Sequence, residues 1–283
     1  VMPKFGVLNI EPAQKAIREV FLRRIVKAKG LSKTDSLLSG ILMPTPSAVM
    51  RAMELLACGC EEESGIGDLL AVDVGGATTD VYSVSEGAPT QVNTVCKGLP
   101  EPFVKRTVEG DIGMRYSVRG ILDAAGPGKL SRISGLPIPR VQTLVQFLRE
   151  HTDTLPNGNP ELEALDRALA SCAIEAAVTR HAGTMEEAYT LMGLTYVQTG
   201  KDLTQVSNLV VTGGSLIHTE QTSKIASYAL YDPAQPMSLR PKQARVLVDR
   251  QYILSAMGLL AASHPACALR IMKKEITVDG DPK

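Results

Sequence analysis

The sequence has no tryptophan, and aromatic residues make up only 4% of its 283 positions. It also lacks an excess of either charge, with 30 Lys and Arg against 30 Asp and Glu. A protein that binds nucleic acid by neutralising phosphates needs a basic surplus, so this balance argues against a nucleic-acid partner. Hydrophobic residues, at 44%, argue against disorder, and the length allows one large or two medium domains.

Cysteine is scarce and irregularly spaced. The five cysteines match no disulfide framework; they are Cys58, Cys60, Cys96, Cys172 and Cys267. We therefore expect reduced thiols and a cytoplasmic protein. Cys58 and Cys60 are separated by one residue, which is too close for a zinc knuckle, so we interpret them as small apolar residues.

Long hydrophobic runs and common catalytic motifs are missing as well. The most apolar stretch, residues 253–272, contains Pro265 and Arg270 and falls short of the ~18 clean apolar residues of a membrane helix, so no membrane association is expected. The four histidines lack metal-ligand spacing, and no Walker A loop or H-E-x-x-H helix is found.

What the sequence does contain is short β-like runs between helical patterns. Residues 69–74, 79–85 and 91–96 predict an antiparallel meander, and residues 209–212 and 246–248 predict two further strands. Apolar spacing near 3.6 predicts helices at residues 12–29, 48–57, 141–151, 161–181, 222–230 and 252–262. Pro44 and Pro46 predict an extended turn, after which Thr45 or Ser47 caps the second helix. The pattern indicates an α/β fold with a mixed sheet flanked by helices.

The most informative segment joins the first two predicted strands. It places an aspartate, two glycines, two threonines and a second aspartate in order: Asp73, Gly75, Gly76, Thr78, Thr79 and Asp80. Glycines let backbone N–H groups reach an anion, and hydroxyls can donate to phosphate oxygens. Carboxylates repel phosphate, so we expect Asp73 and Asp80 to hold Mg²⁺ through its waters. The alternative is a plain Gly-Gly hairpin turn.

Two further segments are candidates for the same site. Gly213, Gly214 and Ser215 follow the predicted strand 209–212 and can pack against a nucleotide, although a tight loop explains them equally well. Glu109 and Asp111 lie among glycines, where they either approach a metal or nucleotide or form a solvated turn. The neighbouring cations Lys105 and Arg106 are weaker candidates for a phosphate contact.

Together these segments resemble the nucleotide fold shared by actin, sugar kinases and the seventy-kilodalton heat-shock chaperones. In that superfamily D-x-G-G-x-T-x-D is the second phosphate motif, V-x-x-G-G-S the adenosine motif, and a small-residue helix the second connecting motif. The matching residues here are 73–80, 210–215 and 255–262. The resemblance implies a ribonuclease H-like, actin-type ATPase fold, ATP and Mg²⁺ as cofactors, and catalytic roles for Asp73 and Asp80.

A closer resemblance covers essentially the whole chain. The stretches VMPKFGVLNIEPA, GILMPTPSAV, DVGGATTDVYSV, KGLPEPFVKRTVEGDIGMRYS and YILSAMGLLA resemble the MutL/GlmL family. These accessory proteins are encoded beside glutamate mutase (methylaspartate mutase) and related cobalamin-dependent aminomutases. The resemblance implies an ATP-dependent reactivating chaperone that binds mutase subunits and lets damaged cobalamin be replaced.

One superfamily feature is absent, because no first phosphate motif, D-x-G-x-T, precedes residue 73. We therefore expect residues 1–66 to be the C-terminal part of domain I with the first connecting helix, and residues 67–283 to be nucleotide-binding domain II. The chain resembles a C-terminal portion of an ATPase, and we do not expect it to hydrolyse ATP by itself. Two alternatives stay open: a small-molecule kinase of the same superfamily, or a non-catalytic module that binds the mutase or forms a homodimer.

Overall fold

The computed structural model describes residues 43–279 except 192 and 220, together with Asn9 and residues 12, 13, 15–17, 19 and 20. The described positions between Pro12 and Val20 are helical; the rest of the predicted helix 12–29 lies outside the described residues. Within these ranges, no helix is long and apolar enough to cross a membrane. All five cysteines are free thiols.

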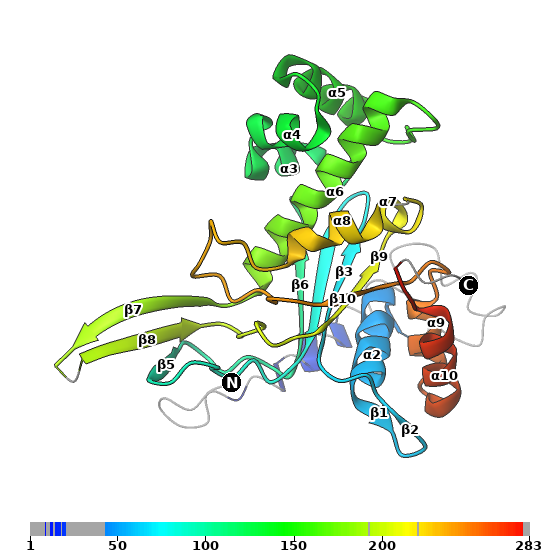
Figure 1. The fold of residues 1–283 in the computed structure, drawn as a ribbon. Coiled ribbons are helices and arrows are strands. Elements are labelled where there is room, and N and C mark those ends of the chain that lie inside the picture. The colour runs from blue at the N-terminus through cyan, green and yellow to red at the C-terminus, as the bar shows by residue number, and fades with distance from the viewer. Residues whose placement is uncertain are drawn as a thin grey trace.

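A six-stranded mixed sheet forms the centre of the molecule, in the order β11-β10-β9-β3-β4-β6 (Figure 1). Its strands are β3 (Leu69–Val74), β4 (Thr79–Val84), β6 (Val104–Glu109), β9 (Asn208–Thr212), β10 (Arg245–Val248) and β11 (Thr277–Val278). β3, β4 and β6 form an antiparallel meander, whereas β9 and β10 run parallel to β3. This confirms the predicted α/β class and four of the predicted strands.

The third strand of the meander was predicted at residues 91–96, and this is wrong. Residues of that stretch belong to β5 (Thr94–Lys97), which pairs with β8 (Gly193–Thr199). β8 pairs in turn with β7 (Thr184–Thr190), and the three form an arm that extends away from the body (Figure 1). The meander strand is β6 instead. Residues 94–97 pair with β8, about a hundred positions away in sequence, so β6 takes the position beside β4 in the sheet.

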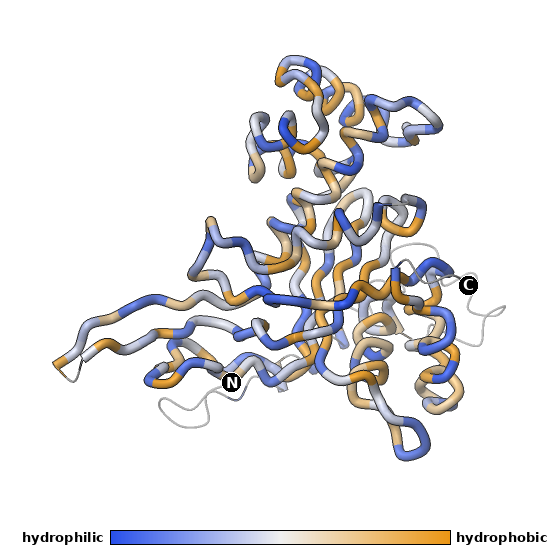
Figure 2. Tube along the Cα trace, in the orientation of Figure 1, coloured by the Kyte–Doolittle hydropathy of each residue, from blue (hydrophilic) through white to orange (hydrophobic). Residues whose placement is uncertain are grey.

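Helices cover both faces of the sheet. One face, which we call the α6 face, is covered by α6 (Pro160–His181), α7 (Gly214–Ile217), α8 (Thr222–Ala226) and a short 3-10 turn (Ser227–Ala229). The opposite face, which we call the α2–α9 face, is covered by α2 (Thr45–Cys58), α9 (Leu254–Leu260) and α10 (Pro265–Glu275). Alternation sends Leu70 and Val72 into the first layer and Leu69 and Ala71 into the second. Figure 2 shows the hydrophobic stretches of the central strands between these layers.

α2 starts earlier than predicted. Pro46 lies in its first turn, where a missing N–H costs nothing, so the predicted extended turn there is wrong. Neither Thr45 nor Ser47 caps the helix; Pro44 is the N-cap residue and makes no side-chain bond. α2 crosses α9 in close contact, because a Cβ on Gly258 would overlap the carbonyl oxygen of Ala48.

Three helices project from the sheet around the first turns of α6 (Figure 1). They are α3 (Val118–Ala125), α4 (Pro127–Ser134) and α5 (Ile138–Glu150). The predicted helices 141–151 and 161–181 are confirmed as α5 and α6, while α3 and α4 were not predicted. Asn159 caps α6 by accepting from the N–H groups of Glu161 and Leu162. A small hairpin, β1 (Gly59–Cys60) and β2 (Glu63–Ser64), follows α2. The predicted division between residues 1–66 and 67–283 stays a prediction.

Candidate functional site

Four polar residues line up across adjacent strands at one edge of the sheet, and we call them the aspartate row: Asp80, Asp73, Thr212 and Asp249. Asp80 of β4 pairs with Asp73 of β3, and Asp73 pairs with Thr212 of β9. Asp249 directly follows β10 and continues the row, since its N–H donates to Val211 beside Thr212. The carboxyl ends of the parallel strands β3, β9 and β10 share one edge, which is why Asp73, Thr212 and Asp249 meet although they are far apart in sequence. Asp80 joins them from the start of the antiparallel strand β4.

The hairpin turn between Asp73 and Asp80 leaves backbone donors free. The Gly75 N–H donates to the Thr78 carbonyl at 2.9 Å, and residues 114–116 donate to the carbonyls of Gly75 and Gly76. Within the described residues, the N–H groups of Gly76, Ala77 and Thr78 have no acceptor. Consecutive free N–H groups in a turn form an anion-binding concavity.

The glycines of the two turns fall into two kinds. A Cβ on Gly75 would crowd the Thr78 carbonyl, and a Cβ on Gly213, whose φ is 104°, would overlap Val74. The fold itself therefore requires these two glycines. Gly76 and Gly214 face open space, where a side chain would meet nothing within 4 Å. Bare backbone beside open space at both turns leaves room for a ligand.

Asp73 is a half-buried carboxylate without a partner. Within the described part of the chain it makes no hydrogen bond or ion pair. Burial, and then the charges of Asp80 and Asp249, raise its pKa from 3.8 to about 6. A charge kept in such a place is unfavourable for the fold, and a bound cation would relieve it.

Asp80 has a different environment, so the two aspartates are not equivalent. Its Oδ1 accepts from Arg106 Nη2 at 2.6 Å and Nε at 2.8 Å, and its Oδ2 accepts from Thr78 Oγ1 at 3.2 Å. Arg106 also lies over the Tyr82 ring, 5.8 Å from its centroid. The guanidinium that was a candidate for phosphate is thus held beside Asp80.

Asp249 was missed by the sequence analysis. It is 1% exposed, and its carboxylate accepts from the N–H groups of Ile253 at 2.9 Å and Leu254 at 3.3 Å and from Thr212 Oγ1 at 3.3 Å. It therefore fastens the start of α9 to the end of β9. An aspartate shortly before a predicted helix is a capping signal that could have identified it.

Tyr252 was also missed. Its φ of 54° lies in the left-handed region that is costly for a bulky residue, and its side chain is 57% exposed. Its N–H donates to the Asp249 carbonyl at 3.1 Å. The charge of Asp73 first, then burial and the charges of Asp249 and Asp80, raise the pKa of its hydroxyl. Backbone strain of this kind persists where the surroundings enforce it, often at functional sites.

Three of the predicted ligands lie elsewhere. Thr79 is fully buried on the α6 face, and its hydroxyl has no partner in the described ranges. Glu109, which pairs with Thr79 in register, and Asp111 both accept from Arg180 of α6, each at 2.7 Å. Arg180 lowers the pKa of Asp111. The structure does not bring these three side chains together with Asp73 and Asp80. Gly213, Gly214 and Ser215, in contrast, lie next to Asp73 because Thr212 pairs with it.

The donor set limits how a metal can be held. Among the residues that the structure describes, no group of three or more His, Cys, Asp or Glu side chains could hold a metal ion. Asp73 is the open carboxylate, and Asp80 is shared with Arg106. One or two carboxylates that act through water, with phosphate as a further ligand, suit Mg²⁺. The residues present therefore fit a water-mediated magnesium ion.

Comparison with known proteins places the chain in a family. A family model described as "MutL protein" matches residues 1–276. A curated relative, Protein MutL of Clostridium tetanomorphum, is 45% identical over 274 residues, which are 97% of this chain and 59% of the relative. The chain thus spans less than two thirds of the length of that relative. With a match over nearly its whole length, the chain belongs to the MutL family.

Proposed function

We propose that this chain is the nucleotide-binding part of an actin-type ATPase and that it binds Mg–ATP at the edge formed by Asp73, Thr212 and Asp249. The arrangement of the motifs supports this. The segment that resembles the second phosphate motif is a hairpin turn with free N–H groups, and the segment that resembles the adenosine motif begins beside it. The two segments that resemble connecting helices, α2 and α9, lie in direct contact.

One observation carries the proposal: the unpartnered carboxylate of Asp73 lies between two glycine turns that face open space. A purely structural hairpin would not place a charge there, since burying it costs stability. Its pKa of about 6 leaves it mostly ionised at neutral pH, as a cation site requires.

We assign each group of the site a role in binding Mg–ATP. The free N–H groups of Gly76, Ala77 and Thr78 bind phosphate oxygens, and Gly214 with Ser215 lies against the nucleoside. The Asp73 carboxylate would hold the waters of a bound Mg²⁺, whose charge would offset that of the phosphates. Asp80 orients Thr78 and Arg106 at the same turn. In phosphoryl transfer, positioning and charge neutralisation supply most of the catalysis.

The biological role that we propose rests on family membership. The MutL/GlmL resemblance implies an accessory protein of glutamate mutase or a related cobalamin-dependent aminomutase. We infer that the full-length protein binds the mutase subunits and that ATP binding and hydrolysis switch it between two states, so that damaged cobalamin leaves and intact cofactor enters.

The direct test is rescue of a cyanocobalamin-inactivated mutase by the full-length protein with ATP. We expect recovery with ATP and none without it. Asp80→Ala should lower ATP hydrolysis at least about tenfold, because a group that positions the phosphate turn is lost. The matched control is Asp153→Asn, an exposed aspartate in the loop before α6. Unchanged hydrolysis in Asp80→Ala would contradict the assignment.

A second candidate is a module that binds the mutase without nucleotide. The Arg106–Asp80 ion pair favours it, since Asp80 already has a counter-charge and needs no metal. Calorimetry separates the two: a saturable heat with Mg–ATP supports the ATPase, and a flat trace supports the module.

A further inference from the structure

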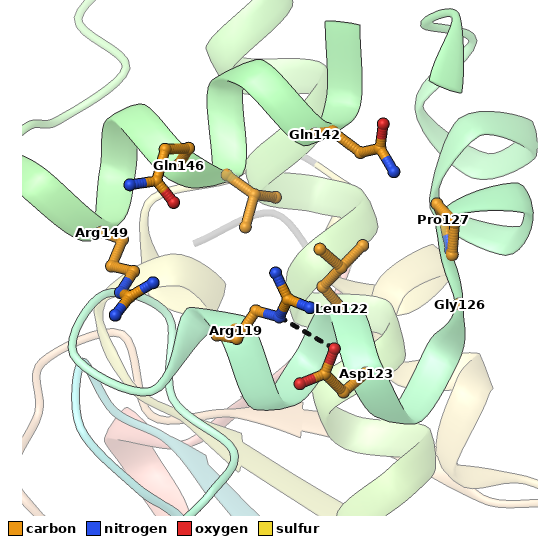
Figure 3. A pocket seen from close by; sticks show the side chains of 9 residues that line it. Arg119, Leu122, Asp123, Gly126, Pro127, Gln142, Gln146 and Arg149 are labelled. Carbon is orange, nitrogen blue, oxygen red and sulfur yellow. Dashed lines mark hydrogen bonds and ion pairs between the residues drawn. The ribbon is translucent and has the colours of Figure 1, made fainter. Parts of the chain in front are cut away.

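We propose that a cavity between α3 and α5 binds a carboxylate group carried on a short apolar chain. The cavity has a volume of about 290 Å³ and lies in the helical projection, on elements separate from the aspartate row. α3 contributes Arg119, Leu122 and Asp123, and α5 contributes Gln142, Val145 and Arg149 (Figure 3). We call it the α3–α5 cavity.

The cavity combines an apolar floor with a polar rim. Leu122 and Val145 are its buried apolar lining, only 7% and 3% exposed, and we call them the floor. Figure 3 shows the side chains of Arg119, Arg149, Gln142 and Gln146 around the same space. Polar residues make up most of its lining, namely Arg119, Asp123, Gln142, Gln146 and Arg149. In pockets for small ligands, polar groups of this kind fix the orientation of the ligand beside its apolar contacts. The volume lies at the lower end of such pockets, so the bound group is small.

The charges at the rim select an anion. Within the described part of the chain, Arg149 and Gln142 make no hydrogen bond or ion pair. Arg119 donates to Asp123 at 2.9 Å, and that pair is mostly exposed. The wall therefore holds one uncompensated guanidinium, which matches a carboxylate through two parallel hydrogen bonds.

A phosphate is a poorer match. The apolar floor remains uncovered under a bare phosphate, whereas a short aliphatic chain would bury it. This favours a carboxylate with an apolar body.

Two sources could supply this chemistry: a free small acid, or a carboxylate on a protein partner. The helical projection stands clear of the sheet, so either could reach it (Figure 1). The inference does not depend on the proposed nucleotide site, because no residue is shared between the two.

The test uses methyl-labelled full chain and nuclear magnetic resonance titration with hexanoate, followed at the Leu122 and Val145 methyl groups. 1-Hexanol, which has the same body without the charge, is the neutral probe. We expect saturable shifts with hexanoate and about fivefold to tenfold weaker binding of hexanol, since one charge-assisted hydrogen-bonded contact is missing. Arg149→Gln should weaken hexanoate binding to the level of hexanol.

Arg140→Gln is the matched control, since Arg140 lies on α5 but outside the cavity and pairs with Glu161. It should leave hexanoate binding unchanged. A peptide ending in a C-terminal leucine carboxylate distinguishes the sources: tighter binding than hexanoate indicates a protein partner, and weaker binding indicates a free acid. Equal binding of hexanol and hexanoate, absence of shifts with both acids, or an unaffected Arg149→Gln variant would overturn the proposal.

Discussion

Two polar groups on opposite faces of the central sheet, His181 and Asp73, have opposite environments. On the α6 face, His181 is fully buried, and both ring nitrogens are hydrogen-bonded, to Thr107 Oγ1 and Ser83 Oγ, each at 2.8 Å. Burial, and then the charges of Lys105 and Lys201, lower its pKa to about 3. At the strand ends of the α2–α9 face, Asp73 has no partner, and its pKa is raised to about 6.

The contrast between His181 and Asp73 distinguishes a structural role from a candidate functional one. A buried group whose bonds are all made contributes to a unique fold, and its removal leaves other groups unpaired. A half-buried charge without a partner weakens the fold, and such groups are enriched at functional sites. The His181 network therefore serves stability, and we expect Asp73 to serve binding at some cost in stability.

The largest effect should come from the helix contact that supports the aspartate row. Gly258→Ala places a methyl group into the backbone of Ala48 and must force α2 and α9 apart. We expect a loss of about 3 kcal/mol or more in the free energy of unfolding, measured by urea denaturation. Gly128→Ala, on α4 with open space around it, is the control and should change stability by less than about 1 kcal/mol. Equal effects would show that α2 and α9 are not in contact.

His181→Leu tests the hydrogen-bonded network of His181, Ser83 and Thr107. The hydroxyls of Ser83 and Thr107 lose their partner, so we expect a destabilisation of about 2–3 kcal/mol in the same assay. Replacing both partners as well, with Ser83→Ala and Thr107→Val, should recover part of the loss. Without any recovery, the network would not be the source of the effect.

His181 and Asp73 should change the stability of the protein in opposite directions when the pH is lowered. His181 has a folded pKa below its ordinary 6.5, so its stabilising contribution is complete above pH 6.5 and is lost as pH falls. Asp73 has a folded pKa above its ordinary 3.8, so its contribution is complete below pH 3.8 and is lost as pH rises through about 6. Between pH 6 and 4 the two slopes oppose each other, each at up to about 1.4 kcal/mol per pH unit.

Comparing His181→Leu and Asp73→Asn with the parent protein isolates the contribution of each group to the dependence of stability on pH. Relative to the parent, His181→Leu should gain stability as pH falls from 6 to 5, and Asp73→Asn should lose it. Parallel curves for all three proteins would contradict the two pKa directions.

Asp73→Asn should stabilise the protein at neutral pH. Removal of the unpartnered charge is expected to raise the free energy of unfolding by about 1–2 kcal/mol. Asp80→Asn provides the contrast, because Arg106 would lose its carboxylate and no gain is expected. Thermal unfolding at pH 7 checks both, and a destabilised Asp73→Asn would mean that the carboxylate has a structural partner.

The smallest effect concerns Tyr252. Tyr252→Gly should relieve the left-handed backbone and raise stability by up to about 1 kcal/mol, while it removes the side chain whose pKa the charge of Asp73 raises. Tyr252→Phe keeps the strain and the ring and should resemble the parent in stability. A less stable Tyr252→Gly variant would show that the ring packs for structure.

The sequence predicted correctly those strands and helices whose local residue pattern matches the burial found in the structure. The β3 and β9 runs are apolar because both faces are covered, and the α6 pattern is long and capped by Asn159. It was insufficient for β5–β8, where pairing between residues about a hundred positions apart decides which run joins the sheet. α3 and α4 are eight residues each, too short for a clear helical period.

The same limit applies to the site. Motif spacing predicted Asp73, Asp80 and both glycine turns as candidates, because these signals are local, and strand register brings these residues together. It could not show that Arg106 pairs with Asp80, or that Arg180 holds Glu109 and Asp111, since each pair joins different strands or a strand and a helix. Thr79 begins β4 and is buried, whereas Thr78 lies in the turn before the strand and bonds Asp80, a boundary that the sequence did not define.

The central claim is that Asp73 is kept unpartnered in order to bind a cation with its nucleotide. Calorimetric titration of Mg–ATP into the full-length protein and its Asp73→Asn variant tests this most directly. We predict saturable binding to the parent and at least about tenfold weaker binding to the variant, although the variant unfolds at a higher temperature. Equal affinity in the two proteins, or no binding to either, would contradict the claim.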